Sequence, residues 1–256
     1  MGASLAPGRA RGQTRGAGQA GSAAHERRQN RAISSPAAQV RPILNGVALG
    51  HAGAYAQARV YTRREAELAA LARATAARGA ALVSDEIYHG LSYGDRAVSA
   101  LEVTDDVVVV NSFSKYFGMT GWRIGWMVVP PDMVRTVERL AQNLFICPSH
   151  ASQVAALAAL DCIDEAEANL AVYARNRAMM LDRLPAIGFD RIAPPDGAFY
   201  AYADIGHLTD DSLAWCARVL DETGVAITPG LDFDTVRGRR TIRLSFAGAT
   251  AEIEEA

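Results

Sequence analysis

The sequence contains almost no lysine. Its lysines and arginines number 26, and all of them except Lys115 are arginine. One explanation is a genome poor in lysine codons, in which a single lysine survives by chance. The other is a requirement for a primary amine here, because a guanidinium stays protonated whereas an ε-amine can lose its proton and form a Schiff base. The residues around Lys115 must decide between these explanations.

Other absences narrow the class of protein. The three cysteines, Cys147, Cys162 and Cys216, have no CxxC spacing. We therefore expect small buried hydrophobic residues in a reducing, cytoplasmic compartment, and neither a disulfide framework nor a zinc site. The five histidines form no HxH or HExxH pattern, so no metal site is predicted. No apolar run reaches the ~18 residues of a membrane span, and a net charge of −2 gives no reason to expect nucleic acid or an anionic membrane as a partner.

The first 60 residues differ in composition from the rest. They hold eight arginines and one acidic residue, Glu26, among many glycines, alanines and serines. Large apolar residues are few and no helical or strand periodicity is sustained, so the segment cannot bury enough surface to offset its ordering entropy. We therefore expect residues 1–60 to be disordered. They also lack the apolar core of a secretory signal.

Regular structure is predicted beyond this first segment. Thr62 and Glu65 form a capping box before a helix that ends at Gly79. The apolar runs ALVS (81–84) and VVVVNSF (107–113) are typical of buried strands. Continuous apolar strands that alternate with helices predict the α/β class, with a largely parallel sheet and flanking helices.

Further helices and a second, smaller domain are predicted towards the C-terminus. Helices are expected over PDMVRTVERLAQNLF, from about Ser149, and from about Glu165 to Leu184. Short strands around GAFYAYA, VAIT and RRTIRLSF, with a helix over DSLAWCARVLDETG, indicate a small α+β domain. We place a large-domain segment at 61–170 and the small domain at 171–256. In the first of these helices the apolar residues fall on one face: Met133, Val137, Leu140, Ala141 and Leu144.

Polar side chains follow both strands of the large-domain segment. The first strand leads into DEIY, which supplies Asp85 and Tyr88, and the second into SFSK, which supplies Ser112, Ser114 and Lys115. Ligands bind beyond the carboxyl ends of parallel strands. An amine, a carboxylate, a phenol and two hydroxyls, with an arginine eight residues after the lysine, suit pyridoxal phosphate. That cofactor offers an aldehyde, a pyridine nitrogen, a phenolic oxygen and a phosphate.

The lysine segment SFSKYFGMTGWRIGW resembles the signature of a known family, the class I/II (fold type I) pyridoxal-phosphate aminotransferases of the aspartate aminotransferase superfamily. ALVSDEIYHGL, PDGAFYAY and TIRLSFA resemble three further segments of that family, so the resemblance covers roughly residues 60–256. It implies the C-terminal part of a pyridoxal-phosphate-binding large domain, followed by a small α+β domain. It also implies amino acid and 2-oxo acid substrates.

The resemblance assigns catalytic roles to three residues. Lys115 would form the internal aldimine and then shuttle a proton between the substrate Cα and the cofactor. Asp85 would keep the pyridine nitrogen protonated, and Tyr88 would donate a hydrogen bond to the phenolic oxygen. Taken alone, Asp85 could instead cap the segment after its strand and Tyr88 could be half-buried packing. Their joint spacing with Lys115 favours the catalytic interpretation.

The phosphate of the cofactor would be held by Ser112, Ser114 and Arg123, with Arg123 as the strongest contributor. Alone, the serines could be turn residues and Arg123 could stack on the tryptophans beside it, Trp122 and Trp126. The lysine-plus-eight spacing of the arginine favours the phosphate role.

The α-carboxylate of the substrate would be bound by Arg243 as a bidentate pair. Arg239 and Arg240 are near competitors in the run RGRRTIR, and alternation along a strand does not single out Arg243. His89 and His150 are interpreted as structural residues.

The sequence departs from the family pattern before residue 60. No Asn-Pro-Thr-Gly occurs in the chain, and GHAGAYAQAR stands in its expected place. The family's Gly-rich phosphate loop and ring-stacking aromatic residue would belong to the same missing part. We expect residues 1–60 to be unrelated to the family, as a frameshifted, fused or mispredicted segment. The chain as written is expected to be a truncated aminotransferase with weak or no turnover, for which the family homodimer is doubtful. Two alternatives stay open: a non-catalytic remnant of the fold, and a fold type I lyase or decarboxylase.

Overall fold

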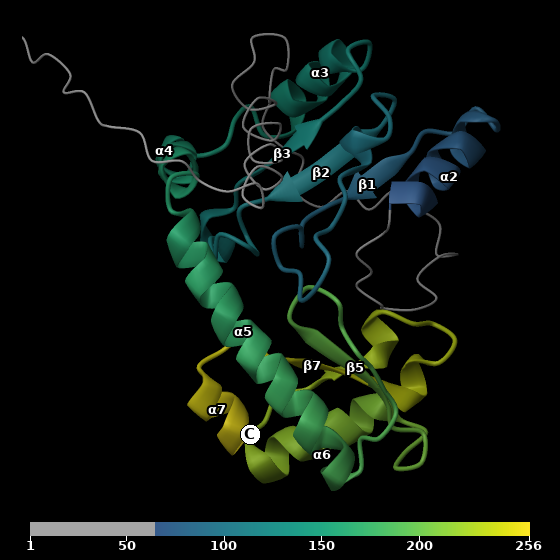
Figure 1. Ribbon diagram of the computed structural model, residues 1–256, viewed down its shortest axis with the longest axis vertical. Helices are drawn as coiled ribbons and strands as arrows, with labels where there is room; N and C mark the ends of the chain where they lie inside the picture. The colour runs from purple at the N-terminus through teal and green to yellow at the C-terminus, as the bar shows by residue number, and fades with distance from the viewer. Residues whose placement is uncertain (1–64) are drawn as a thin grey trace, which may run out of the picture. The chain divides into compact units, whose positions relative to one another are not determined.

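The computed structural model of the chain describes residues 65–256 (Figure 1). The first described element is helix α2, Glu65–Ala76. The chain leaves this helix through a turn in which Gly79 has a φ of 61°, and glycine adopts this left-handed conformation without steric cost. The predicted helix end at Gly79 is therefore correct to within three residues. The Thr62 cap and the expected disorder of residues 1–60 lie outside the described residues.

The first sheet contains three strands in the order β1-β2-β3. Strands β1 (Val83–Asp85) and β2 (Val108–Ser112) are parallel, as the apolar runs predict. Strand β3 (Gly125–Val128) pairs antiparallel with β2 and was not predicted. Its four residues continue directly from the lysine segment and carry no separate strand pattern. The result is the expected α/β layer with an antiparallel strand on one side.

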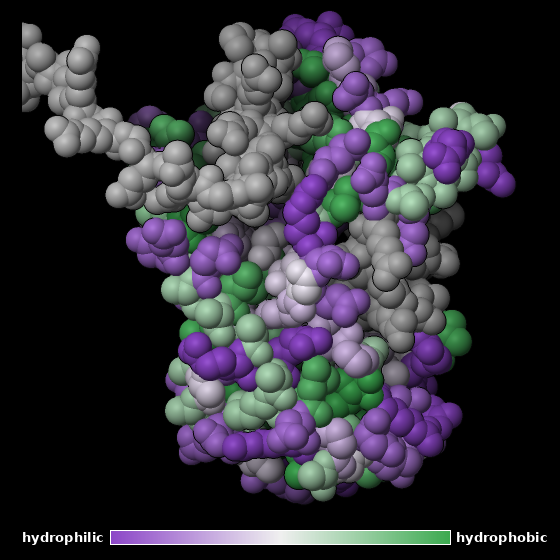
Figure 2. All heavy atoms as spheres, viewed as in Figure 1, coloured by the Kyte–Doolittle hydropathy of each residue, from purple (hydrophilic) through white to green (hydrophobic). Residues whose placement is uncertain are grey.

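Helices α3 (Val134–Leu144) and α4 (His150–Ala159) follow this sheet, close to their predicted positions. The apolar face predicted for α3 is largely uncovered, since Ala141 is buried while Leu140 is 47% and Leu144 61% exposed. On the face of the molecule drawn in Figure 2, hydrophobic residues likewise reach the surface between polar ones.

The long helix α5, Ile163–Arg183, begins two residues before its predicted start at Glu165. It leads into a second sheet of four antiparallel strands in the order β4-β5-β7-β6. These strands are β4 (Ile192–Ala193), β5 (Tyr200–Asp204), β6 (Thr228–Pro229) and β7 (Thr241–Ser245). Helices α6 (Ser212–Thr223) and α7 (Thr250–Glu255) complete this part, which contains the elements expected of the small domain. Short 3-10 helices are η1 (Ala100–Glu102), η2 (Thr120–Trp122), η3 (Leu184–Ile187), η4 (Gly230–Asp232) and η5 (Gly238–Arg240).

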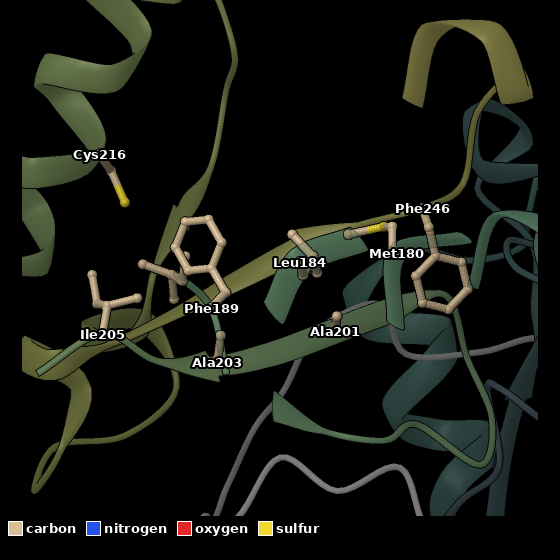
Figure 3. Packing of buried hydrophobic residues seen from close by; sticks show 9 residues of the cluster. Met180, Leu184, Phe189, Ala201, Ala203, Ile205, Cys216 and Phe246 are labelled. Atoms are coloured by element: carbon tan, nitrogen blue, oxygen red, sulfur yellow. The ribbon is translucent and has the colours of Figure 1, made fainter. Parts of the chain in front are cut away.

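The largest buried cluster belongs to the second sheet. Residues of α5, α6, β5 and β7 pack together there, and Figure 3 shows their side chains gathered along β5 and β7. Asn176 of α5, which is fully buried, donates hydrogen bonds from Nδ2 to the carbonyl oxygens of Phe246 (3.0 Å) and Gly248 (2.9 Å). These bonds join α5 to the segment that follows β7. The cluster consists of Met180, Leu184, Phe189, Ala201, Ala203, Ile205, Cys216, Ile242 and Phe246.

Two further findings concern the sequence expectations. Cys216 is buried as expected, but Cys147 and Cys162 are exposed, so the expectation of three buried cysteines is wrong. Both exposed cysteines lie in short connections between helices, and such connections run over the surface.

The division into 1–60, 61–170 and 171–256 stays a prediction, and the proposed 170/171 boundary falls inside α5. Across the described range, no helix is both long and apolar enough to cross a membrane.

Candidate active site

Directly after β2 the lysine segment forms a loop in which Ser112 contacts both Ser114 and Ile124. The Ser112 and Ser114 hydroxyl oxygens lie 2.8 Å apart, and the Ser112 hydroxyl also lies 3.1 Å from the carbonyl oxygen of Ile124. The backbone N–H of Ser114 donates to the Ser112 hydroxyl at 3.0 Å. A turn in which the N–H of Gly118 donates to the Lys115 carbonyl at 3.1 Å closes the loop. The structure thus brings the two predicted serines together beside Lys115.

Arg123 reaches the same loop through Thr120. The Thr120 hydroxyl donates to the Ser114 carbonyl at 2.7 Å, and Nη1 of Arg123 donates to the Thr120 carbonyl at 2.8 Å. Arg123 is exposed and adopts a left-handed backbone conformation with φ 51°, which costs a residue with a side chain roughly 1 kcal/mol. A cation linked through Thr120 to the loop that carries two hydroxyls is a donor set that suits a phosphate. Thr120, the connecting residue, was not predicted.

Lys115 is half-buried against aromatic rings. Its Nζ atom lies 5.7 Å from the centroid of the Tyr88 ring and 5.6 Å from that of Phe199. Among the described residues Lys115 has no carboxylate partner within ion-pair distance. Within residues 65–256 the amine therefore lies beside the Tyr88 ring and is not engaged in an ion pair, which leaves it accessible to a carbonyl group.

Tyr88 is the centre of the aromatic group around Lys115. Its ring lies edge-on to Phe199 (5.9 Å between centroids) and Tyr200 (6.0 Å). Burial raises the pKa of the Tyr88 hydroxyl, its hydrogen bond with Tyr200 raises it further, and Asp85 adds a smaller effect, whereas Arg243 lowers it. The hydroxyl therefore stays protonated at neutral pH and can serve as a hydrogen-bond donor, which is the role predicted for it.

Asp85 lies at the end of β1 with an exposed side chain. Its Oδ1 atom accepts a hydrogen bond from the Ile87 backbone N–H at 3.2 Å, so the capping interpretation of this residue is satisfied. The next residue, Glu86, is 2% exposed and accepts the N–H of Ala100 at 2.8 Å, which anchors the turn after β1. The predicted role of Asp85 towards a pyridine nitrogen stays a prediction.

The structure separates Arg243 from its two competitors. The Cζ atom of Arg243 lies 4.2 Å from the centroid of the Tyr200 ring and 4.0 Å from that of Phe233. Arg239 instead pairs with Asp211 at 3.5 Å, and Arg240 packs its guanidinium over Gly206, where a Cβ atom would lie 2.3 Å from Nε. Of the three arginines, Arg243 alone faces the aromatic group around Tyr88.

Sequence reasoning found Tyr88 but missed three other aromatic residues of this site, Phe199, Tyr200 and Phe233. Phe199 and Tyr200 lie within the segment PDGAFYAY, which carried the family resemblance, so their position gave a usable signal. Phe233 follows η4 and has no motif around it, and only the fold places it against β7.

Comparison with known proteins identifies the family. The family model for aminotransferases of class I and II matches residues 62–256. The chain belongs to this family. The expected resemblance and the predicted fold class are thereby confirmed.

Individual aminotransferases match with substantial identity. The valine–pyruvate aminotransferase of Mycobacterium tuberculosis is 52% identical over 194 residues, which cover 74% of this chain and 50% of that protein. A solved structure from Silicibacter pomeroyi, described as an aminotransferase, is 64% identical with a TM-score of 0.73, covering 75% of this chain and 52% of that one. An aspartate aminotransferase structure from Thermotoga maritima is 32% identical with a TM-score of 0.69, covering 77% and 50%. The chain spans about half the length of the curated relatives it matches.

Aminotransferases of this family depend on pyridoxal phosphate. The donor set described above fits that cofactor. The paired hydroxyls of Ser112 and Ser114 with Arg123 suit its phosphate, and the protonated hydroxyl of Tyr88 suits its phenolic oxygen. The amine of Lys115 has no described acid to neutralise it and suits its aldehyde.

Proposed function

We propose that this chain carries a pyridoxal-phosphate-dependent aminotransferase site, which moves an amino group between an amino acid and a 2-oxo acid. The observation that supports this most is the arrangement of two cationic groups around one aromatic group. Lys115 lies 5.7 Å from the Tyr88 ring, and Arg243 lies 4.2 Å from the ring of Tyr200, which contacts Tyr88. An amine for the cofactor and a guanidinium for a carboxylate thus lie against the same group of aromatic rings.

In this proposal each predicted residue keeps a distinct task. Ser112, Ser114 and Arg123 bind the phosphate, and Asp85 holds a proton on the pyridine nitrogen. Tyr88 donates a hydrogen bond from its protonated hydroxyl. The bound cofactor supplies an electron sink that acidifies the substrate Cα–H.

Two residues act on the substrate itself. Lys115 would accept the Cα proton as a free amine and deliver it to the imine carbon of the cofactor, on the other side of the amino nitrogen. Arg243 binds the α-carboxylate through two N–H groups and so orients the substrate, which determines which bond at Cα is cleaved.

The geometry around Arg243 favours transamination over decarboxylation. A guanidinium that has no described acidic partner is available to hold a carboxylate throughout the reaction. Decarboxylation requires that the same carboxylate be released as CO₂, which a bidentate cation opposes. The remnant alternative draws on coverage, because the chain spans only about half the length of its relatives. For the same reason we expect turnover to be low.

The amino donor is proposed from the relatives. The 52% identical Mycobacterium tuberculosis protein carries the name valine–pyruvate aminotransferase, whereas the aspartate aminotransferases are 32–34% identical. We therefore propose valine and pyruvate as the first pair of substrates to test, with aspartate as the competing donor.

A labelled-nitrogen assay tests the proposal even if turnover is weak, because mass spectrometry detects small amounts of labelled product. The full chain with pyridoxal phosphate, ¹⁵N-valine and pyruvate should form ¹⁵N-alanine, measured by mass spectrometry. Lys115→Arg should reduce this to background, because a guanidinium cannot replace the amine. Arg243→Lys should lower the rate at low valine about 10²-fold, while the matched change Arg239→Lys should leave it unaltered. Transfer that persists in Lys115→Arg, or release of ¹³CO₂ from carboxyl-labelled valine in place of transfer, would contradict the proposal. No transfer at all would favour the remnant.

A further inference from the structure

The guanidinium of Arg243 lies over two aromatic rings. Its Cζ atom lies 4.2 Å from the Tyr200 ring and 4.0 Å from the Phe233 ring. Tyr200 comes from β5, the strand beside Arg243 in the second sheet. Phe233 comes from the loop after η4 and reaches Arg243 independently of that strand pairing. Two separate elements thus each place an aromatic ring against one cation.

The two rings restrict where Arg243 can make hydrogen bonds. A guanidinium carries five N–H donors in one plane, and it stacks on aromatic faces through its own face, which leaves those donors free at its edge. Attraction between the cation and the ring faces also opposes rotation out of this plane. A carboxylate is planar and matches two such donors side by side, so the restricted group is already in the orientation that bidentate binding requires.

The loop that carries Phe233 is itself firmly braced. The N–H groups of Phe233 and Asp234 both donate to the Gly230 carbonyl at 2.9 Å. The Asp234 carboxylate is buried and accepts the N–H groups of Val236 and Arg237, each at 2.9 Å. These bonds set the loop conformation, so the position of Phe233 is determined by the backbone around it.

Close approach to β7 fixes this loop against the strand of Arg243. A Cβ atom on Gly230 would lie 2.0 Å from Oγ1 of Thr241, and one on Gly238 would lie 2.7 Å from the Gly230 backbone. Neither glycine has room for a side chain. The backbone that carries Phe233 is therefore packed closely at both ends of the loop.

We propose that Phe233 is a positioning residue for substrate binding: it holds the Arg243 guanidinium edge-on, ready to bind a carboxylate through two N–H groups. The inference rests on the proposed function, because it concerns the carboxylate of the same substrate. Tyr200 shares the stacking but also contacts Tyr88, so changing it would disturb the cofactor side of the site. Phe233 makes no ring–ring contact with the described aromatic residues, and it isolates the effect on Arg243.

The test measures carboxylate binding at Arg243 without relying on turnover. Phenylglyoxal modifies arginine, and mass spectrometry of Glu-C peptides from the full chain quantifies modification at Arg243 with increasing pyruvate. In the wild-type chain pyruvate should protect Arg243. Phe233→Leu should raise the pyruvate concentration needed for half-protection about tenfold, since a ring face is lost. In Phe233→Tyr the pyruvate concentration for half-protection should stay within about threefold of the wild-type value, because tyrosine keeps the ring face.

Matched variants separate positioning from a general loss of structure. Val236→Ala changes an exposed residue of the same loop (88% exposed) and should leave protection unaltered. Phe233→Met is a second non-aromatic variant, and it should lose protection as Phe233→Leu does, with circular dichroism verifying the fold of each.

The possible outcomes distinguish this inference from the proposed function. Protection in Phe233→Leu or Phe233→Met equal to that in the wild type would overturn the inference alone. A loss of protection in Phe233→Tyr as large as that in Phe233→Leu would also overturn the inference, because the ring face would then not be what positions Arg243. If pyruvate fails to protect Arg243 in the wild-type chain, the proposed carboxylate role of Arg243 fails as well.

Discussion

The two regions of the described structure differ in how completely they are packed. The Lys115 region consists of β1, β2 and β3 with α3 and α4, and the C-terminal region consists of α5, α6 and α7 with the second sheet. Nine buried residues form one cluster in the C-terminal region, whereas the buried residues of the Lys115 region divide into clusters of four and three. The groups proposed for cofactor chemistry thus lie on the less packed region, and the carboxylate-binding arginine lies on the better packed one.

Uncovered apolar side chains occur in both regions and are more numerous in the Lys115 region. The Lys115 region exposes large hydrophobic residues from β1, α3, the connection after α3, and α4: Val83, Leu140, Leu144, Ile146, Val154 and Leu157. The C-terminal region exposes Ile187, Leu208, Leu213, Leu220 and Val236. A three-stranded sheet offers little area against which such helices can pack. Burial, more than helix or strand propensity, therefore limits the stability of the Lys115 region.

The largest expected effect tests the contrast in packing. Phe246 has no exposed surface and belongs to the nine-residue cluster, whereas Leu144 is 61% exposed. Phe246→Ala should lower the free energy of unfolding by about 3–5 kcal/mol through lost burial and a cavity. Leu144→Ala should change it by no more than about 0.5 kcal/mol. Urea denaturation followed by circular dichroism measures both, and similar costs for the two changes would remove the contrast.

A smaller effect concerns a contact that supports the lysine loop. Gly90 has a φ of 95°, and a Cβ atom there would lie 2.5–2.9 Å from the ring of Tyr116, the residue next to Lys115. The Tyr116 hydroxyl bonds to Glu167 of α5 and so links the two regions. Gly90→Ala should cost about 2–4 kcal/mol, because backbone strain and displacement of the ring add together.

Gly79 provides the matched control for this change. It also has a positive φ of 61°, but nothing lies within 4 Å of a Cβ atom built there. Gly79→Ala should therefore cost only the backbone strain, about 1 kcal/mol. Equal losses of unfolding free energy in the two alanine variants would show that the Tyr116 ring adjusts without cost.

The smallest effect is a pH dependence in the loop of the C-terminal region that carries Phe233. The backbone N–H of Arg237 lowers the pKa of Asp234 from its ordinary value, against an opposing effect of burial, and the Val236 N–H and the Arg237 side chain lower it further. A carboxyl whose pKa is lower in the folded state stabilises the fold above its unfolded pKa, and this stabilisation is lost as pH falls through the folded value. Asp234→Asn should therefore cost about 1 kcal/mol at pH 7.

Thermal melts between pH 7 and pH 3 measure that dependence. The wild-type chain and Asp234→Asn should differ most at neutral pH and converge as the pH falls below about 3.8, the ordinary pKa of the carboxyl group. A difference that stays constant over this range would mean that the charge of Asp234 does not stabilise the loop.

The sequence predicts those elements whose pattern is local. The runs ALVS and VVVVNSF lead to β1 and β2 because apolar β-branched residues need no distant partner to be recognised. The segment DSLAWCARVLDETG likewise forms α6, with Asp211 as its N-cap and Gly224 as its C-cap. Strand β3 was missed because its residues continue the lysine segment. The family resemblance selected Arg243, but strand alternation could not separate it from Arg239 and Arg240. That separation depends on Asp211 and Gly206, which lie elsewhere in the chain.

The aromatic contacts of Arg243 show what local patterns cannot reveal. Phe233 meets Arg243 because Gly230 and Gly238 allow the loop between them to pack tightly against β7. Neither glycine carries a motif that would indicate this approach. Contacts of this kind depend on the fold, and they became visible only in the structure.

The central claim is that Lys115 is the cofactor-binding amine, and one measurement tests it directly. The full chain is incubated with pyridoxal phosphate, reduced with borohydride, digested and analysed by mass spectrometry. Because Lys115 is the single lysine, the only competing primary amine is the N-terminal one. We expect the label on the peptide that contains SFSK, with strongly reduced labelling in Arg123→Gln and wild-type labelling in the surface control Arg183→Gln. Label confined to the N-terminal amine, or equal labelling of the chain in Lys115→Arg, would contradict the account.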